Sequence, residues 1–196
     1  MAGFNINNFR SQLAFDGARP NLFNISINMN NLVLPNGAQA SQKIAFMGKS
    51  AQLPGSTVGT VPLYYFGREL KFAGNRNFAD WTVQIINDED FSIRKALEQW
   101  MNNINSHAGN LRTANYASPA GYSVDGYVSQ YAKTGTALKT YKMVGMFPLD
   151  ISPIDLDWGS NDSIEEYAVT FAYQWWESDT TDGVGGPIPP TTLGIG

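Results

Sequence analysis

Three acidic pairs are the side chains in this sequence best suited to acid–base chemistry. They are Asp155 with Asp157, Glu165 with Glu166, and Asp88 with Asp90. Two carboxylates at the right separation can hydrolyse a glycosidic bond. The last pair directly precedes a helical pattern, where carboxylates cap free backbone N–H groups and oppose the helix dipole. The other pairs lie on or beside predicted strands, so we expect none of the three to be catalytic.

Other catalytic motifs are incomplete. His107 is the single histidine, at the end of the predicted helix, and the chain has no cysteine. Disulfides, cysteine nucleophiles and His-pair metal sites are therefore excluded. Residues 48–50 read Gly-Lys-Ser, but position 43 is a lysine where a phosphate-binding loop requires glycine. Residues 55–59 resemble a nucleophile elbow, but the serine comes one position too early. We predict no enzyme activity, no cofactor and no metal.

Composition limits the remaining function classes. The chain has 196 residues, the size of one domain. Only 15% of residues are charged, and the net charge is −4. A protein that grips nucleic acid needs clustered Lys and Arg, which this balance does not favour. The five tryptophans and nine tyrosines could stack on single strands. Without a basic groove, we expect them in the core and in subunit interfaces.

Neither a leader nor a membrane anchor is expected. The first ten residues, MAGFNINNFR, lack a basic stretch followed by an apolar core. No apolar run approaches the ~18 residues of a membrane helix. The sequence therefore predicts a soluble protein that starts in a cytoplasm.

Strand patterns cover most of the chain before residue 87. A weak helical pattern at 5–15, stopped by Gly17, comes first. Residues 22–30 alternate as in a half-buried strand, and Pro35-Asn36-Gly37 predicts a turn. Further strands are predicted at 44–51, 64–72 and 78–86. A loop at 53–60 and a turn at Gly74-Asn75 separate them.

One helix is predicted, at about residues 88–107. Its apolar residues recur at helical spacing: Ile93, Ala96, Leu97, Trp100, Met101 and Ile104. Gly109 is expected as its C-terminal stop.

The remaining pattern completes a mainly β fold. Strands are predicted at 122–131, 138–147, 150–157 and 164–176. This order predicts an antiparallel β-barrel or sandwich with one flanking helix. We expect a single domain over residues 1–177, with 1–17 as an N-terminal arm or short helix. Residues 178–196 form a Gly/Pro-rich tail that cannot build a core.

Four segments, in order, resemble the tail tube proteins of contractile-tailed bacteriophages, from about Ala18 to Glu177. They read ARPNLF (18–23), LPGSTVGTVPLYYFGRELKFAGNR (53–76), DWTVQIINDEDFSIRKALEQWMNNINSH (80–107) and FPLDISPIDLDWGSNDSIEEYAVTFAYQWWE (147–177). That family is similar in fold to the tubes of type VI secretion and of phage-tail-like bacteriocins. The resemblance implies a β-barrel subunit with a flanking helix. It also implies hexameric rings whose strands join into one inner barrel, stacked into a tube.

The resemblance assigns one loop to assembly. The segment around 53–60 is similar to the family's extended loop, which reaches a neighbouring subunit or ring. Its residues are Leu53, Pro54, Gly55, Ser56, Thr57, Val58 and Gly59. Its alternative is a mobile hairpin tip. Arg68, with Glu69 and Lys71, is a candidate for polar contacts between rings, or part of a solvated strand face.

An acidic bore is expected, because repulsion lets DNA slide through without binding. The candidate lumen-lining acids are Asp125, Asp155, Asp157, Glu165 and Glu166. The implied partners are other copies of the chain, a tail sheath protein, baseplate and tail-terminator proteins, and phage DNA in transit. The implied location is the virion, after assembly in the host cytoplasm.

Three alternatives remain open at this point. The first is a tube subunit of a bacteriocin-like or type VI-like injection system, which shares the fold but not the DNA cargo. The second is a carbohydrate-binding or hydrolytic β-domain of a tail, and the third is a ligand-binding barrel with an apolar pocket.

Overall fold

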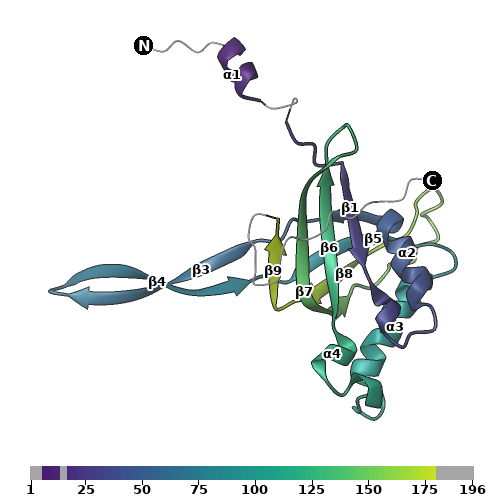
Figure 1. Cartoon of the computed structure of the whole chain (residues 1–196). Coiled ribbons are helices and arrows are strands. Elements are labelled where there is room, and N and C mark those ends of the chain that lie inside the picture. The colour runs from purple at the N-terminus through teal and green to yellow at the C-terminus, as the bar shows by residue number, and fades with distance from the viewer. Residues whose placement is uncertain (1–5, 14–16, 180–196) are drawn as a thin grey trace.

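Seven antiparallel strands form the body of the molecule (Figure 1). The computed structural model describes residues 6–13 and 17–179. The strand order is β1-β6-β7-β8-β5-β2, and β9 also pairs with β7. The strands are β1 (Phe23–Ile27), β2 (Gly48–Ala51), β5 (Trp81–Ile86), β6 (Val124–Tyr131), β7 (Ala137–Ile151), β8 (Glu166–Ala172) and β9 (Trp175–Ser178). The predicted mainly β, antiparallel, sandwich-like fold is confirmed.

The long strand β7 joins the two layers of the sandwich. Its first part pairs with β6 and β9, and its last part, from Phe147, pairs with β8. Between the two parts lies Gly145, with φ 66°, where the register with β6 shifts by one residue. A glycine bulge of this kind bends a strand and lets it pass from one layer to the other.

The hydrophobic core lies between the two layers and two helices. Core-facing side chains alternate along the strands, as with Trp81, Val83 and Ile85 of β5. Helix α3 (Ser92–Ile104) contributes Leu97 and Trp100, both fully buried. Burying side chains of this size contributes about 1.5–3 kcal/mol each.

Helix α3 differs from its prediction at both ends. It begins after Phe91, which has φ 53° and provides no side-chain cap. Asp90 accepts a hydrogen bond from the Ser92 N–H at 2.9 Å, but its other oxygen pairs with Lys43. The helix ends at Ile104, five residues before Gly109, so Gly109 is not the helix stop. The acidic cluster thus ties α3 to a second helix as well as capping it.

That second helix, α2 (Gly37–Met47), occupies residues predicted as a turn and the start of a strand. Its buried residues Ala40 and Ile44 lie one turn apart and pack it beside β1 and α3. Gly37 begins it where a Cβ would lie 2.9 Å from the Met29 carbonyl oxygen. Only the last part of the predicted strand at 44–51 is a strand, β2.

Two strand boundaries were also wrong. The segments predicted separately at 138–147 and 150–157 form the single strand β7, which ends at Ile151. Pro148 is tolerated within it because the register with β8 shifts there. Conversely, the strand predicted at 164–176 is divided into β8 and β9 by Tyr173 and Gln174.

Short elements complete the described chain. They are α1 (Ile6–Gln12), the 3₁₀ turns Met29–Asn31 and Ala114–Tyr116, and α4 (Pro119–Tyr122). Helix α1 agrees with the weak pattern at 5–15 and lies apart from the body in Figure 1. Residues 1–5, 14–16 and 180–196, and so most of the predicted tail, lie outside the described residues. No helix among the described residues is long and apolar enough to cross a membrane.

Candidate assembly surfaces

A two-stranded hairpin projects from the body (Figure 1). It consists of β3 (Ser56–Tyr65) and β4 (Arg68–Phe78), which pair only with each other in the described structure. All ten residues of β3 are exposed. The sequence predicted a loop at 53–60, of which only residues 53–55 lie outside a strand, and a turn at Gly74-Asn75, which lies within β4. It also predicted one strand at 64–72, which the hairpin turn interrupts. The turn is instead Phe66-Gly67, with φ 46° and 75°, the backbone that a tight two-residue hairpin requires.

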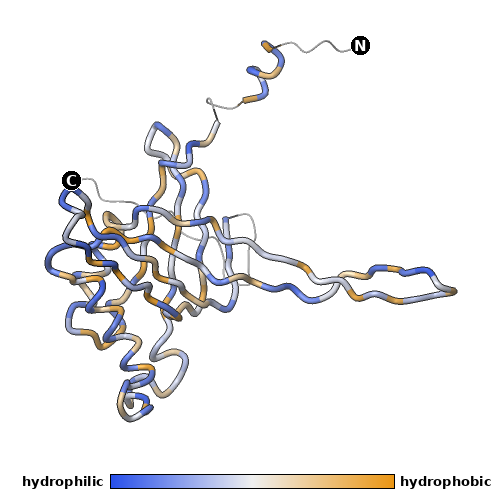
Figure 2. Tube along the Cα trace, turned by 180° about the vertical axis from the view of Figure 1, so that it is seen from behind, coloured by the Kyte–Doolittle hydropathy of each residue, from blue (hydrophilic) through white to orange (hydrophobic). Residues whose placement is uncertain are grey.

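One face of this hairpin is apolar. Residues directly opposite each other on paired strands share a face, and the pairs Leu63–Leu70 and Val61–Phe72 are adjacent on the same face. The four side chains are 46–55% exposed, with no core beneath them. Figure 2 shows hydrophobic residues distributed along the projection. Isolated hairpins are marginally stable in water, so this face is suited to burial against another surface.

Tryptophans anchor the base of the hairpin. The Trp81 indole N–H donates to the Gln52 carbonyl oxygen at 2.7 Å, and the Trp176 indole N–H donates to the Gly55 carbonyl oxygen at 3.1 Å. The Phe78 ring lies 6.5 Å from that of Trp176. These contacts fix the direction in which the hairpin leaves the body.

The predicted loop residues are therefore distributed over two elements. Leu53, Pro54 and Gly55 form the connection that the tryptophans hold, whereas residues 56–59 belong to β3. Arg68 begins β4, next to the turn. Gly59 and Gly74 lie so close together that a Cβ on Gly74 would be 3.1 Å from the Gly59 carbonyl oxygen. The lack of side chains here allows the two strands to approach closely.

The layer β1-β6-β7-β9 has two open edges. In the described residues, β1 pairs with β6 alone and β9 with β7 alone. Its face away from the core is largely polar, although it also carries Trp175, 43% exposed, opposite Val144. One row across it is Ser26, Tyr127, Lys142 and Glu177. Open edges template pairing with another chain, so this layer can join a neighbour on each side.

Asp125 is the predicted lumen acid that lies on this layer. Its Oδ2 lies 2.9 Å from Lys142 Nζ, and its Oδ1 accepts the N–H of the bulge residue Gly145 at 3.2 Å. The bonded carboxylate raises the pKa of Lys142. Asp125 therefore stabilises the bulge that bends β7.

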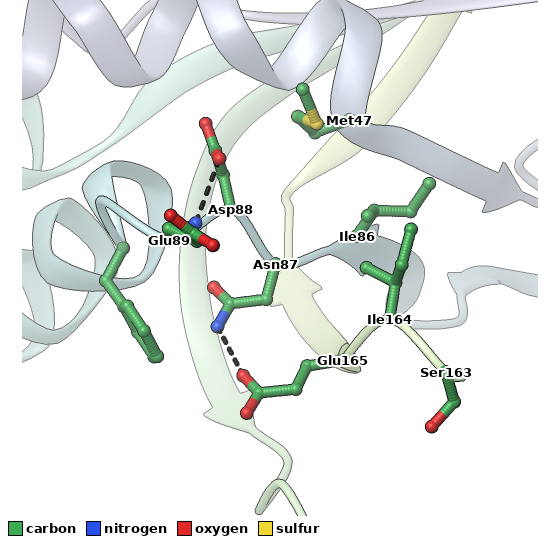
Figure 3. Close-up of a pocket in the computed structure, with 9 residues that line it drawn as sticks. Met47, Ile86, Asn87, Asp88, Glu89, Ser163, Ile164 and Glu165 are labelled. Atoms are coloured by element: carbon green, nitrogen blue, oxygen red, sulfur yellow. Dashed lines mark hydrogen bonds between the residues drawn. The ribbon is translucent and has the colours of Figure 1, made fainter. Parts of the chain in front are cut away.

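The other four predicted lumen acids lie elsewhere. Asp155 and Asp157 lie in the connection between β7 and β8, not on a strand as predicted. Glu166 begins β8 and pairs with Lys49 at 2.6 Å. Glu165 accepts a hydrogen bond from Asn87 Nδ2 at 2.8 Å, at the side of the cleft in Figure 3. These acids are grouped at the far end of β8, away from Asp125.

No catalytic arrangement is found among the residues that the structure describes. Asp88 and Asp90 both pair with Lys43. The hydrogen bond from Lys43, then that from the Ser92 N–H, lowers the pKa of Asp90 to about 2. His107 is exposed beyond the end of α3. The described part of the chain holds no cluster of three potential metal ligands.

Similarity to known proteins identifies the family of this chain. The family model for phage tail tube proteins matches residues 7–179. The chain belongs to the phage tail tube protein family. The resemblance indicated by the four sequence segments is thereby confirmed.

Individual relatives agree with this family. The chain is 34% identical over 163 residues to the tail tube protein gp19 of Enterobacteria phage T4, covering 83% of this chain and 92% of gp19.

Two solved structures share the tail tube fold. One is the sheath–tube complex of the extracellular contractile injection system PVC, with TM-score 0.58, 15% identity, and coverage of 90% of this chain and 98% of that one. The other is the six-fold symmetrised anti-feeding prophage baseplate, with TM-score 0.57, 14% identity, and coverage of 82% and 94%.

Sequence reasoning about this tail tube protein missed two surface features. Apolar and polar residues alternate along the hairpin as they do along a strand that faces the core, so its projection from the body was not predicted. In the segment 152–166 only the acids were singled out as candidate surface residues, and Trp158, which is fully exposed, was grouped with the aromatic residues expected in the core or in subunit interfaces. The available signal was a tryptophan between Asp157 and Gly159, in a stretch of mostly polar and acidic residues.

Proposed function

We propose that this protein assembles into hexameric rings that stack to form the inner tube of a contractile phage tail, the conduit for DNA ejection. The observation that carries this proposal is the combination of two open edges on one polar-faced layer with a projecting apolar arm. In a monomer, open strand edges and an exposed apolar surface both favour aggregation. Assembly would pair the edges and bury the apolar surface. The role is structural, with no catalytic step.

Ring closure uses the layer β1-β6-β7-β9. Strand β9 of one copy pairs with β1 of the next, so that every edge is paired and the polar face points inward. Six copies of four strands, spaced ~4.8 Å apart and tilted by ~40°, form a barrel roughly 48 Å across at the backbone. Barrels of about 16–18 strands already leave an aqueous channel, so this barrel leaves a bore wide enough for duplex DNA.

The charge of the bore follows from this arrangement. Each chain carries −4, so a hexamer carries about six times −4, roughly −24. Net negative charge repels phosphates and prevents the DNA from binding during transit. We assign Asp125 to the bore wall together with Glu177 and Lys142. The four other acids predicted for the bore lie at the far end of β8, so we assign them to a contact between copies.

The proposed partners follow from the same role. They are a tail sheath protein around the outer wall, baseplate and terminator proteins at the ends, and DNA inside. The PVC relative in fold comes from a sheath–tube complex, and the anti-feeding prophage relative from a six-fold baseplate. Residues 1–177 act as one tube domain and 178–196 as a tail. Assembly takes place in the host cytoplasm, and the final location is the virion.

The alternative is a tube subunit of a bacteriocin-like or type VI-like injection system. The fold is compatible with it, but the 34% identity to a phage tail tube protein favours the phage.

Negative-stain electron microscopy of the purified full chain, with its solution mass, tests this proposal. We expect rings with a central hole or tubes built from them, and a mass that is a multiple of six chains. A monomer that forms no ring at high concentration or with added baseplate contradicts the proposal.

A further inference from the structure

Helix α1 presents an apolar stripe that the described residues leave open. Ile6, Phe9 and Leu13, which directly follows the helix, recur three and four residues apart, the spacing of one helix face. They are 79%, 67% and 44% exposed. No side chain of α1 is buried among the described residues, and Figure 1 shows the helix apart from the body. A helix of seven residues is too short to be stable in water alone, so the stripe requires a partner.

Residues 180–196 have the composition to cover this stripe. Their single charged residue is Asp182, opposite in sign to Arg10, which lies four residues after Ile6 and so flanks the stripe. They follow the last residue that the family model matches, Asp179, and are therefore an addition to the matched fold. Their large apolar side chains are Val184, Ile188, Leu193 and Ile195.

Both segments leave the layer β1-β6-β7-β9 at the same end. One row across its four strands consists of Ile25, Val128, Tyr141 and Ser178. Because Ser178 is the last residue of β9 and Phe23 the first residue of β1, β9 ends level with the beginning of β1. Figure 1 shows α1 beyond this end of the layer. Residues 180–196 therefore start at the rim that carries α1.

Ring closure brings these segments of neighbouring copies together. All adjacent strands of the layer are antiparallel, so β9 of one copy meets β1 of the next in antiparallel orientation. The end of that β9 then lies one strand spacing, ~4.8 Å, from the β1 that follows α1 of the next copy. The β1 of its own copy is three spacings away, about 14 Å. The nearer helix is thus that of the next copy.

We infer that residues 180–196 of one copy cover the apolar stripe of α1 in the next copy of the same ring. Their apolar side chains pack on Phe9 and its neighbours, and Asp182 lies near Arg10. This inference rests on the proposed ring and adds a contact at its rim. Each copy gives one segment and receives another, so the contact is head-to-tail and closes with the ring.

The lengths of chain permit this contact. The carbonyl oxygen of Arg19 accepts hydrogen bonds from the Leu22 N–H and from Gln130 Nε2, each at 3.3 Å, which fixes the chain beside β1. Leu13 precedes Arg19 by six residues, so it lies within ~20 Å of this anchor. Residues 180–196 reach up to ~56 Å when extended. Attachment to copies that are already paired raises the effective concentration of this small contact.

Disulfide trapping in rings of the full chain tests the inference. The chain has no cysteine, so introduced pairs have no background. The test variant carries Phe9→Cys and Ile188→Cys, and its oxidised rings are analysed on a denaturing, non-reducing gel. Because each copy contacts only the next copy of its ring, we expect a ladder that ends at six linked chains. A disulfide within one chain, a ladder beyond six chains or no linkage overturns the inference.

The matched control moves one cysteine to the other side of α1. Ser11 is two residues after Phe9, about 200° further round the helix. Rings of Ser11→Cys with Ile188→Cys should give at least tenfold less linked protein. Equal linkage from the two pairs would reflect proximity without packing on the stripe, and would overturn the inference.

Trypsin cleavage after Arg10 supplies a second readout without a change in α1. The full chain with Ile188→Asp and Leu193→Asp is compared, in rings, with Thr180→Asp and Thr181→Asp, which add the same charge. We expect cleavage at Arg10 to be at least tenfold faster in the first variant, and cleavage after Arg112, which lies on Tyr122 at the other end of β6, to be equal. Equal cleavage at Arg10 overturns the inference.

The oligomeric state separates the possible failures. In dilute monomers we expect both variants to be cleaved at Arg10 at the same rate, since the stripe is covered by another copy. A difference in monomers assigns residues 180–196 to α1 of their own chain and overturns the inference. Rings in which α1 is neither linked nor protected leave the proposed function intact and reject this contact. A protein that forms no rings rejects both.

Discussion

The indole N–H of Trp176 donates to the carbonyl oxygen of Gly55 across 121 positions of sequence, at 3.1 Å. This bond joins the last strand of the sandwich to the base of the projecting hairpin. Trp176 also contacts Tyr141 and Phe78, with ring centroids 5.4 Å and 6.5 Å away. One side chain therefore couples the open edge at β9 to the arm, the two surfaces from which the assembly is proposed.

Replacing Trp176 by Phe should cost about 0.5–1.5 kcal/mol of unfolding free energy, since it removes one hydrogen bond and keeps most of the ring contact. Urea unfolding of dilute protein measures this change. Trp158→Phe is the matched control, because its fully exposed side chain should change stability by less than about 0.5 kcal/mol. Equal effects of the two substitutions contradict the anchoring role of Trp176.

Replacing Gly74 by Val should distort the hairpin and abolish tubes. The added Cβ lies 3.1 Å from the Gly59 carbonyl oxygen, so the two strands must move apart there, and the two methyl groups of valine increase the strain. The sandwich should keep its Tm to within a few degrees, because the hairpin pairs with no other strand in the described structure. Electron microscopy and thermal unfolding together check this. Gly109→Ala, which meets only ordinary contacts, should preserve tubes, and tubes formed by Gly74→Val protein would refute the prediction.

Asp125 should matter to stability as a hydrogen-bond acceptor as well as a charge. Asp125→Ala removes the acceptor for the Gly145 N–H and the partner of Lys142, and we expect a loss of about 1–2 kcal/mol. Asp125→Asn keeps an oxygen for the Gly145 N–H and should lose less. Chemical denaturation of both variants measures which of them loses more unfolding free energy. A larger loss for Asn than for Ala would show that the bulge does not depend on this bond.

Acid stability should depend on Asp90. Its pKa falls to about 2 in the folded protein, chiefly through Lys43 and then the Ser92 N–H, from an ordinary value near 3.9. A depressed folded pKa gives stability that is fully present above the unfolded value and is lost as pH falls. Wild-type stability should therefore drop between about pH 4 and pH 2. The slope of stability against pH over this range should be shallower in Asp90→Asn protein than in wild type. Identical slopes for wild type and Asp90→Asn would disprove the linkage.

The sequence predicted the elements whose pattern is determined by the core. The alternation of Ile25 and Ile27 located β1, and the helical spacing of Leu97 and Trp100 located α3, because in each case one side is buried. The weakly amphipathic α2 lacked such a pattern, and Pro35-Asn36-Gly37, at which it begins, is typical of a turn.

The hairpin could not be predicted from the sequence for a different reason. Its apolar face alternates like a core strand but faces no core, so the pattern gave no indication that it projects. Gly59 and Gly74 indicated loops, although they allow two strands to approach closely. Similarly, the sequence did not show that the acids at 155–166 lie at one end of β8, because their position depends on where β7 ends and β8 begins.

A cryo-electron microscopy reconstruction of the assembled tube shows directly whether the β1-β6-β7-β9 layers of neighbouring copies join. We expect one bore lined by Ser26, Tyr127, Lys142 and Glu177, with β9 of each copy hydrogen-bonded to β1 of the next. An assembly in which these edges remain unpaired, or in which the β1-β6-β7-β9 layer faces the outside, would contradict it.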